Sequence, residues 1–228
     1  MWPFSRSVES RRRKVLKKTQ HPLMRDFYVA EAAHRKQDWR ETPLVAVDLE
    51  TTGLNPQKDQ ILSIGLVEMH QGSIHLDSAW HQIVQVEQQI PEETAVIHHI
   101  TDDQMAKGGS ISEVLPALLQ RLRGKVMLVH YAFVEQAFID AACKNLYDTP
   151  FVIPTIDTLK LAHRRMSARN HTISPHELRL FNLRKLYDLP EYKAHNAMYD
   201  AIATAELFMA MAADSNPNGP QRIGDYLN

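Results

Sequence analysis

The sequence lacks several features that would assign it to particular classes of protein. It holds one cysteine, Cys143, which excludes an intramolecular disulfide and fits a reducing compartment. It contains no run of about 18 apolar residues, so we expect no membrane span and no membrane partner. Its start, Met1 to Phe4, precedes a basic run instead of following one, which is not the order of a secretory signal. With no internal repeat and no low-complexity domain, the chain is predicted to be a cytoplasmic globular protein.

Net charge is also small, at −1, but it is unevenly distributed. Residues 1–40 hold 11 Lys or Arg against 4 acids, whereas the remainder holds 15 against 23. We therefore predict a basic, largely helical N-terminal extension at 1–40, a main domain at 41–213 and an irregular tail at 214–228. The densest basic run, 11–18, could contact nucleic-acid phosphates, but a solvated helix face or an electrostatic partner for the acidic body fits it equally.

The order of the expected elements indicates the fold class. Strands are expected at 45–50, 59–69 and 74–84, at 126–129, and at most briefly at 151–154. Helices are expected at 110–122, 133–146, 157–165 and 196–213, with a further helix start at Ser174-Pro175. A meander of strands followed by alternating strands and helices predicts an α/β protein. Its mixed sheet would be antiparallel first and then parallel, flanked by helices and preceded by the helical extension.

Two acids end the first expected strand. Asp48 and Glu50 follow the apolar run that starts at Val45, and side chains two residues apart on a strand point to the same face. Two neighbouring carboxylates repel each other and are costly to desolvate, so a cation normally lies between them. Hard oxygen ligands suit Mg²⁺ or Mn²⁺ better than zinc. An exposed strand end with two solvated acids remains the alternative.

Two later segments carry residues of the same kind. Glu135 lies just beyond the apolar strand 126–129, near the start of a helix. His195 lies at the entrance of the last expected helix, and Asp200 follows about one turn into it. Sites in sheet proteins of this kind lie at strand ends and helix starts, so these segments are expected to converge.

These three motifs, in this order and with a His-x4-Asp ending, resemble the DEDDh family of 3′–5′ exonucleases. That family has a ribonuclease H-like fold and includes the epsilon proofreading subunit of bacterial DNA polymerase III. The resemblance covers residues 43–212. It implies that Asp48, Glu50, Glu135 and Asp200 hold two divalent ions, Mg²⁺ or Mn²⁺, and that His195 is the general base.

The resemblance also implies a substrate and contacts to it. Thr51 and Leu54 match positions that contact the terminal nucleotide in the family. The expected activity is hydrolysis of single-stranded nucleic acid, DNA first and RNA also, from the 3′ end to nucleoside 5′-monophosphates. A polymerase or another protein is the expected partner. His130, which ends the strand 126–129 on the side of the site, is a further candidate for substrate contact.

The second motif departs from the family pattern. Tyr131 stands where the family usually has asparagine, and Glu135 stands where it usually has aspartate. Glutamate keeps the charge, and Asp140 is the rival ligand, over a turn further along the helix. The pair His98-His99 lacks further ligands at zinc spacing, so a cleft wall or loop packing is favoured there over a metal site.

A second hypothesis comes from a different class of protein. The chain could be a nucleic-acid-binding or polymerase-associated interaction module whose catalytic site has decayed. Decay usually removes an acid or the histidine, and every motif position here still holds one, which favours an active enzyme.

Overall fold

The computed structural model of the chain describes residues 7–86, 104, 107–168, 173–215 and 219–228. Within these residues a five-stranded sheet has the order β3-β2-β1-β4-β5. The strands are β1 (Leu44–Thr51), β2 (Ile61–His70), β3 (Ser73–Ile83), β4 (Val126–Val129) and β5 (Thr155–Asp157). Strands β1, β2 and β3 pair antiparallel, whereas β4 pairs parallel with both β1 and β5. The predicted mixed sheet, a meander followed by parallel strands, is confirmed.

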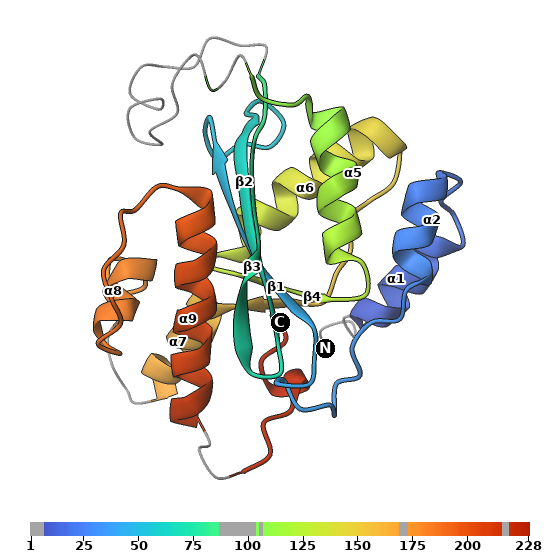
Figure 1. Ribbon diagram of the computed structural model, residues 1–228. Helices are drawn as coiled ribbons and strands as arrows, with labels where there is room; N and C mark the ends of the chain where they lie inside the picture. The colour runs from blue at the N-terminus through green and yellow to red at the C-terminus, as the bar shows by residue number, and fades with distance from the viewer. Residues whose placement is uncertain (1–6, 87–103, 105–106, 169–172, 216–218) are drawn as a thin grey trace.

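Helices cover both faces of this sheet. They are α1 (Val8–Leu16), α2 (Pro22–Val29), α5 (Ile111–Leu122), α6 (Ala132–Tyr147), α7 (Thr158–Ala168), α8 (Leu180–Lys185) and α9 (Ala197–Ser215), with a short 3-10 helix η1 (Ile223–Asp225). Helices α7, α8 and α9 lie on one face, while α5 and α6 lie on the other with α1 and α2 beyond them (Figure 1). In the described part of the chain, no helix is both long and apolar enough to cross a membrane.

Strand β1 divides the core into two halves. Val45, Val47 and Leu49 pack with α2, α5 and α6, whereas Leu44 and Ala46 pack with α7, α8 and α9. This alternation is the two-residue period of a strand that is buried on both faces, and it explains why β1 is apolar almost throughout.

One expected strand lies a few residues further along the chain. Residues 151–153 do not pair with β4; the Pro154 carbonyl accepts the Met127 N–H at 2.9 Å, and the pairing continues in β5 at Thr155–Asp157. The reason lies in side-chain hydrogen bonds that use the backbone of the earlier segment. The Val152 N–H donates to the Tyr28 hydroxyl, and the Val152 carbonyl accepts from Arg12.

The basic extension packs into the body of the protein. Met24, Phe27 and Tyr28 of α2 are buried in the same core half as β1, α5 and α6. Both α1 and α2 are helical as expected, but residues 30–40 hold no helix. The extension therefore contributes to the core as well as to the surface charge.

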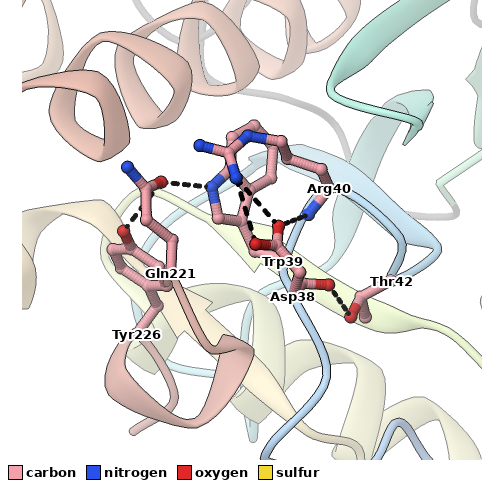
Figure 2. Close-up of polar contacts among 6 residues, drawn as sticks. All are labelled: Asp38, Trp39, Arg40, Thr42, Gln221 and Tyr226. Atoms are coloured by element: carbon pink, nitrogen blue, oxygen red, sulfur yellow. Dashed lines mark hydrogen bonds and ion pairs between the residues drawn. The ribbon is translucent and has the colours of Figure 1, made fainter. Parts of the chain in front are cut away.

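The tail, residues 219–228, contacts the end of the basic extension near Trp39. Figure 2 shows Gln221 accepting hydrogen bonds from Trp39 Nε1 at 2.6 Å and from the Tyr226 hydroxyl at 3.3 Å. Residues 219–228 hold only the short helix η1, and Ile223 and Tyr226 are buried against α9 and β5 residues of the second core half. The tail thus adds to the second half of the core, whereas α2 of the extension adds to the first.

Candidate metal centre and active site

Three carboxylates from two elements meet at one face of the sheet. Asp48 and Glu50 lie near the end of β1, on the face that Leu44 and Ala46 share, which α9 covers. Asp200 lies in the first turn of α9. One carboxylate oxygen from each of Asp48, Glu50 and Asp200 lies within 4.8 Å of the other two. The structure thus brings together the first and last predicted motifs.

A glycine in the neighbouring strand lets α9 approach so closely. Gly65 of β2 pairs with Asp48. A Cβ atom added at Gly65 would overlap the backbone of Ala197 and Met198 at the start of α9. The start of the helix therefore rests directly on the sheet backbone, and Asp200 lies beside the β1 acids as a result.

Glu135 reaches the site from the first turn of α6 and is only 3% exposed. It lies outside the group of three oxygens, yet its charge is among the causes that raise the pKa of Asp48, after burial. The rival acid Asp140 is engaged elsewhere, because it accepts the Phe151 N–H at 2.8 Å and forms an ion pair with Lys144. Of the two candidates, Glu135 is the acid that the structure places near Asp48.

Asp157 at the end of β5 holds the start of α6 in place. Its two carboxylate oxygens accept the N–H groups of Tyr131 and Ala132, each at 3.1 Å. Tyr131 has a left-handed backbone with φ of 78°. Asp157 also accepts the Leu159 N–H, at 3.0 Å, so one buried carboxylate joins the starts of α6 and α7. The direction in which α6 leaves the sheet, and hence the place of Glu135, depends on it.

The electrostatics of the four acids reflect crowding in a buried place. Burial, then the charges of Glu135, Glu50 and Asp200, raise the pKa of Asp48 well above its usual value. Burial raises the pKa of Glu135 in the same direction. Burial and the charge of Glu50 raise the pKa of Asp200 to about 7, against hydrogen bonds from the His195 and Asn196 backbone. Ionised carboxylates in this arrangement call for a compensating positive charge.

The residues present fit a divalent cation. Among the described side chains, the buried oxygens Glu135 Oε2 and Asp200 Oδ1 have no hydrogen-bond partner. Carboxylate oxygens in such a cluster are the donors that hard divalent cations prefer. The acidic cluster is therefore suited to divalent metal binding.

His195 lies at the edge of this cluster. Its backbone is left-handed, with φ of 66°, and its N–H donates to Asp200 Oδ2 at 3.0 Å. Asn196 then caps α9 by accepting the Tyr199 N–H at 3.2 Å. Residue 195 is exposed and precedes the first residue of α9.

Comparison with known proteins decides the family. A family model described as an exonuclease, RNase_T, matches residues 45–208, and this range includes Asp48, Glu50, Glu135, His195 and Asp200. The chain belongs to this exonuclease family. The resemblance inferred from the three motifs is confirmed.

Relatives of this exonuclease include parts of much longer proteins. The PolC-type DNA polymerase III of Thermotoga petrophila is 31% identical over 184 residues, which is 81% of this chain and 13% of that polymerase. The chain thus spans about an eighth of the length of that curated relative.

Solved structures share the fold. Exonuclease X in complex with 5′ overhanging duplex DNA has a TM-score of 0.60 at 23% identity, covering 80% of this chain and 98% of that one. The nuclease domain of 3′hExo, a DEDDh family member bound to rAMP, has a TM-score of 0.65 at 16% identity, covering 78% and 96%. The predicted ribonuclease H-like fold is confirmed.

The predicted substrate contacts of the exonuclease occupy different environments. The Thr51 hydroxyl donates to the Gly53 carbonyl at 2.6 Å, and Leu54 is 72% exposed. Asp59 closes this turn by accepting the Asn55 N–H at 2.8 Å. Leu54 therefore presents an apolar side chain on a turn just beyond β1, where a nucleotide could pack on it.

His130 is bound on both ring nitrogens. Nδ1 lies 2.8 Å from the Thr158 hydroxyl and Nε2 lies 3.0 Å from the Leu178 carbonyl. Burial lowers its pKa to about 4, so the neutral ring joins the end of β4 to α7 and residue 178. A substrate contact through a ring nitrogen would have to replace one of these bonds. The pair His98-His99 lies outside the described residues.

Sequence reasoning missed residues that depend on strand register. His81 of β3 pairs with Gly65, and Gly65 pairs with Asp48, so the histidine lies in the same row across the sheet. Burial lowers the pKa of His81, and the charge of Glu50 opposes that shift. A strand histidine carries no motif, so the sequence alone holds no signal for it.

Proposed function

We propose that the protein is a metal-dependent 3′–5′ exonuclease of the DEDDh type. It would hydrolyse single-stranded nucleic acid, DNA foremost and RNA also, to nucleoside 5′-monophosphates. The observation that carries the proposal is the cluster of Asp48, Glu50 and Asp200 from β1 and α9, with Glu135 of α6 close enough for its charge to raise the pKa of Asp48. Among the described side chains, buried oxygens of Glu135 and Asp200 have no hydrogen-bond partner. Solved structures with the same fold hold a 5′ overhanging duplex DNA and rAMP, which supports a nucleic-acid substrate.

Each acid has a role in the proposed chemistry. Asp48, Glu50, Glu135 and Asp200 would hold two divalent ions, Mg²⁺ or Mn²⁺. When bound, such ions supply an activated water and stabilise charge on the attacking and leaving oxygens. The raised pKa values of Asp48 and Asp200 describe the metal-free acids. Because carboxylates bind metal in the ionised form, metal binding would release protons.

His195 would accept the proton of the attacking water. Residue 195 is exposed and its backbone N–H binds Asp200, so its imidazole would be close to a water held above the acids. Histidine is the side chain that most often serves as a general base. Thr51 and Leu54 would hold the terminal nucleotide, with His130 as a further candidate contact.

The setting in the cell is also a proposal. The match to PolC-type polymerases supports a role beside a polymerase in the cytoplasm. The exonuclease unit would be residues 41–213, with 1–40 and 214–228 packed against it. A decayed binding module is not favoured, because the structure buries acids from all three motifs at one place.

Digestion of a 5′-labelled single-stranded DNA and a matched RNA, with Mg²⁺ or Mn²⁺, tests the proposal. We expect a ladder that shortens from the 3′ end, and none with EDTA or with Asp48→Ala. His195→Ala should slow the reaction about 10²–10⁴-fold, the usual contribution of a general base. His163→Ala removes an exposed histidine on α7 and should leave the rate unchanged. An absence of cleavage with both strands and both metals would refute the proposal.

A further inference from the structure

A groove lined by positive charges lies between α1 and the segment that follows α6. Its volume is about 1100 Å³. The lining side chains include four cations, namely Arg11, Lys14, Lys18 and Arg35. The acid Asp148 and the last residue of the sequence, Asn228, also line it. None of these residues belongs to the metal centre.

Three of the groove cations belong to α1 and to the turn that follows it. Arg11 and Lys14 are three residues apart on α1, which places them on one helix face, and Lys18 lies in the turn just after α1. All three are exposed, and within the described residues none of them forms an ion pair. Their charges are therefore available to a ligand from solvent.

Buried hydrogen bonds fix the orientation of α1. Arg12, between the groove residues in sequence, is buried and donates to the carbonyls of Phe27, Ala30 and Val152. Its guanidinium also packs on the rings of Phe27 and Tyr28. Because Arg12 turns inward, Arg11 and Lys14 are held on the outer side. The groove is thus built before any ligand arrives.

The wall opposite α1 is held in the same way. The hydroxyls of Thr19 and Thr149 lie 2.6 Å apart in a buried hydrogen bond. The Tyr28 hydroxyl donates to the Pro150 carbonyl at 2.6 Å. Both contacts tie residues 148–152 to the basic extension. A groove with fixed walls and exposed cations suits a flexible polyanion. Because the walls are already ordered, only the polyanion loses conformational freedom on binding.

We propose that this groove binds backbone phosphates of a nucleic-acid strand upstream of the 3′ end that the metal centre holds. The inference rests on the proposed function, which makes a phosphate chain the polyanion most often near the protein. Helix α6 connects the two places, with Glu135 in its first turn and Asp148 at its end. At 1.5 Å per residue these two lie about 20 Å apart along the helix, or about six nucleotides of a stacked strand.

Charge-matched pairs of substitutions on α1 and on the turn that follows it (residues 17–18) test the groove. Arg11→Gln with Lys18→Gln removes two groove cations. Arg13→Gln with Lys17→Gln removes one exposed arginine and one exposed lysine of the same segment that do not line the groove. The binding of a labelled 20-nucleotide single strand is measured by fluorescence anisotropy in EDTA, between 50 and 200 mM salt. General electrostatic attraction would be reduced equally in both variants.

The groove pair should lower the salt dependence of binding more than the control pair. Each phosphate contact to a single strand contributes about 0.7 to the slope of log affinity against log salt, so two lost contacts lower it by about 1.4. A fourfold rise in salt would then weaken the unsubstituted protein about sevenfold more than the groove variant. Equal slopes for the two variants would overturn the inference.

A trinucleotide separates this inference from the proposed function. Three stacked nucleotides span about 10 Å and cannot reach the groove from the metal centre, so both variants should degrade a trinucleotide at the unsubstituted rate. If the groove substitutions lower the affinity for the trinucleotide and for the 20-mer by the same factor, the groove is not an upstream site. If no strand is cut by any variant while the slopes differ as expected, the groove stands and the proposed function fails.

Discussion

Among the proposed metal ligands, Glu135 is the one that departs from the usual residue of the family. Aspartate is usual there, and the glutamate adds one methylene between the backbone and the carboxylate. The structure shows the longer side chain buried, with its charge felt by Asp48 across the site. The carboxylate is therefore retained at the centre although the residue type has changed. Charge and position, more than residue identity, decide whether a metal can be held.

Two substitutions of Glu135 separate charge from length. Glu135→Gln keeps the size but removes the charge, so we expect turnover to fall at least about 100-fold if the proposed metal ligand is lost. Glu135→Asp keeps the charge in a shorter side chain and should retain turnover within about tenfold. Rates are measured on the labelled DNA strand at saturating Mg²⁺. Equal losses in the two variants would contradict a role for the charge.

Asp200 predicts a pH dependence of stability for the metal-free protein. Its pKa is about 7 in the folded protein and about 3.9 in an unfolded chain, so the folded state binds the proton more tightly. The contribution of Asp200 to the free energy of unfolding therefore falls as pH rises from about 4 to about 7, by up to about 4 kcal/mol.

Urea unfolding in EDTA, compared between the unsubstituted protein and Asp200→Asn, checks this dependence. As pH rises from about 4 to about 7, the free energy of unfolding of the unsubstituted protein should fall relative to that of Asp200→Asn. Taking the difference cancels the opposite trend from His130, whose pKa is lowered to about 4. A difference that is flat or that rises with pH would show that Asp200 is not a crowded, buried acid.

At the scale of elements, the site depends on two close junctions. Helix α9 starts on the backbone of Gly65, which brings Asp200 and His195 to the acids of β1. Helix α6 starts on the carboxylate of Asp157, which directs Glu135 inward. Neither junction residue would contact substrate in the proposed mechanism. They position the residues that would.

Gly65→Ala tests the first junction. The added methyl group overlaps the backbone of Ala197 and Met198, so the start of α9 must shift. We expect a loss of about 1–3 kcal/mol in stability and at least a tenfold loss of turnover. Gly109→Ala is the control, because its methyl group would meet the Val114 side chain at 3.0 Å and not a backbone. Equal effects of the two substitutions would argue against the junction.

At the scale of the whole molecule, α2 and the tail (219–228) each contribute to one half of the core. Residues of α2 fill the core half beneath α5 and α6, and the tail fills the other half beside α9. Each half of the core must be covered on its own side of the sheet. The family range 45–208 includes neither α2 nor the tail, so these two segments add cover from outside that range. Removing residues 1–40 would therefore expose core side chains as well as remove charge.

Phe27→Ala measures how much the extension contributes. Phe27 is 2% exposed and packs on Phe151 with ring centroids 5.7 Å apart. We expect a loss of about 3–5 kcal/mol in the free energy of unfolding, measured with urea. Val29→Ala, at a residue of the same helix that is 61% exposed, should change stability by less than about 0.5 kcal/mol. A small loss for Phe27→Ala would mean that the extension is a separate appendage.

The sequence by itself determined the fold class, a mixed sheet that is antiparallel first and then parallel, and the acids worth testing. Those inferences rest on local patterns, namely the apolar run into Asp48 and Glu50 and the spacing of His195 and Asp200, which survive in a linear chain. The tertiary structure supports Glu135 over Asp140, because packing buries Glu135 near Asp48, whereas Asp140 binds the Phe151 N–H and Lys144. It also placed Gly65, Asp157 and the α1 groove, since contacts between distant residues depend on register and on close backbone approach. Such contacts have no signature in neighbouring residues.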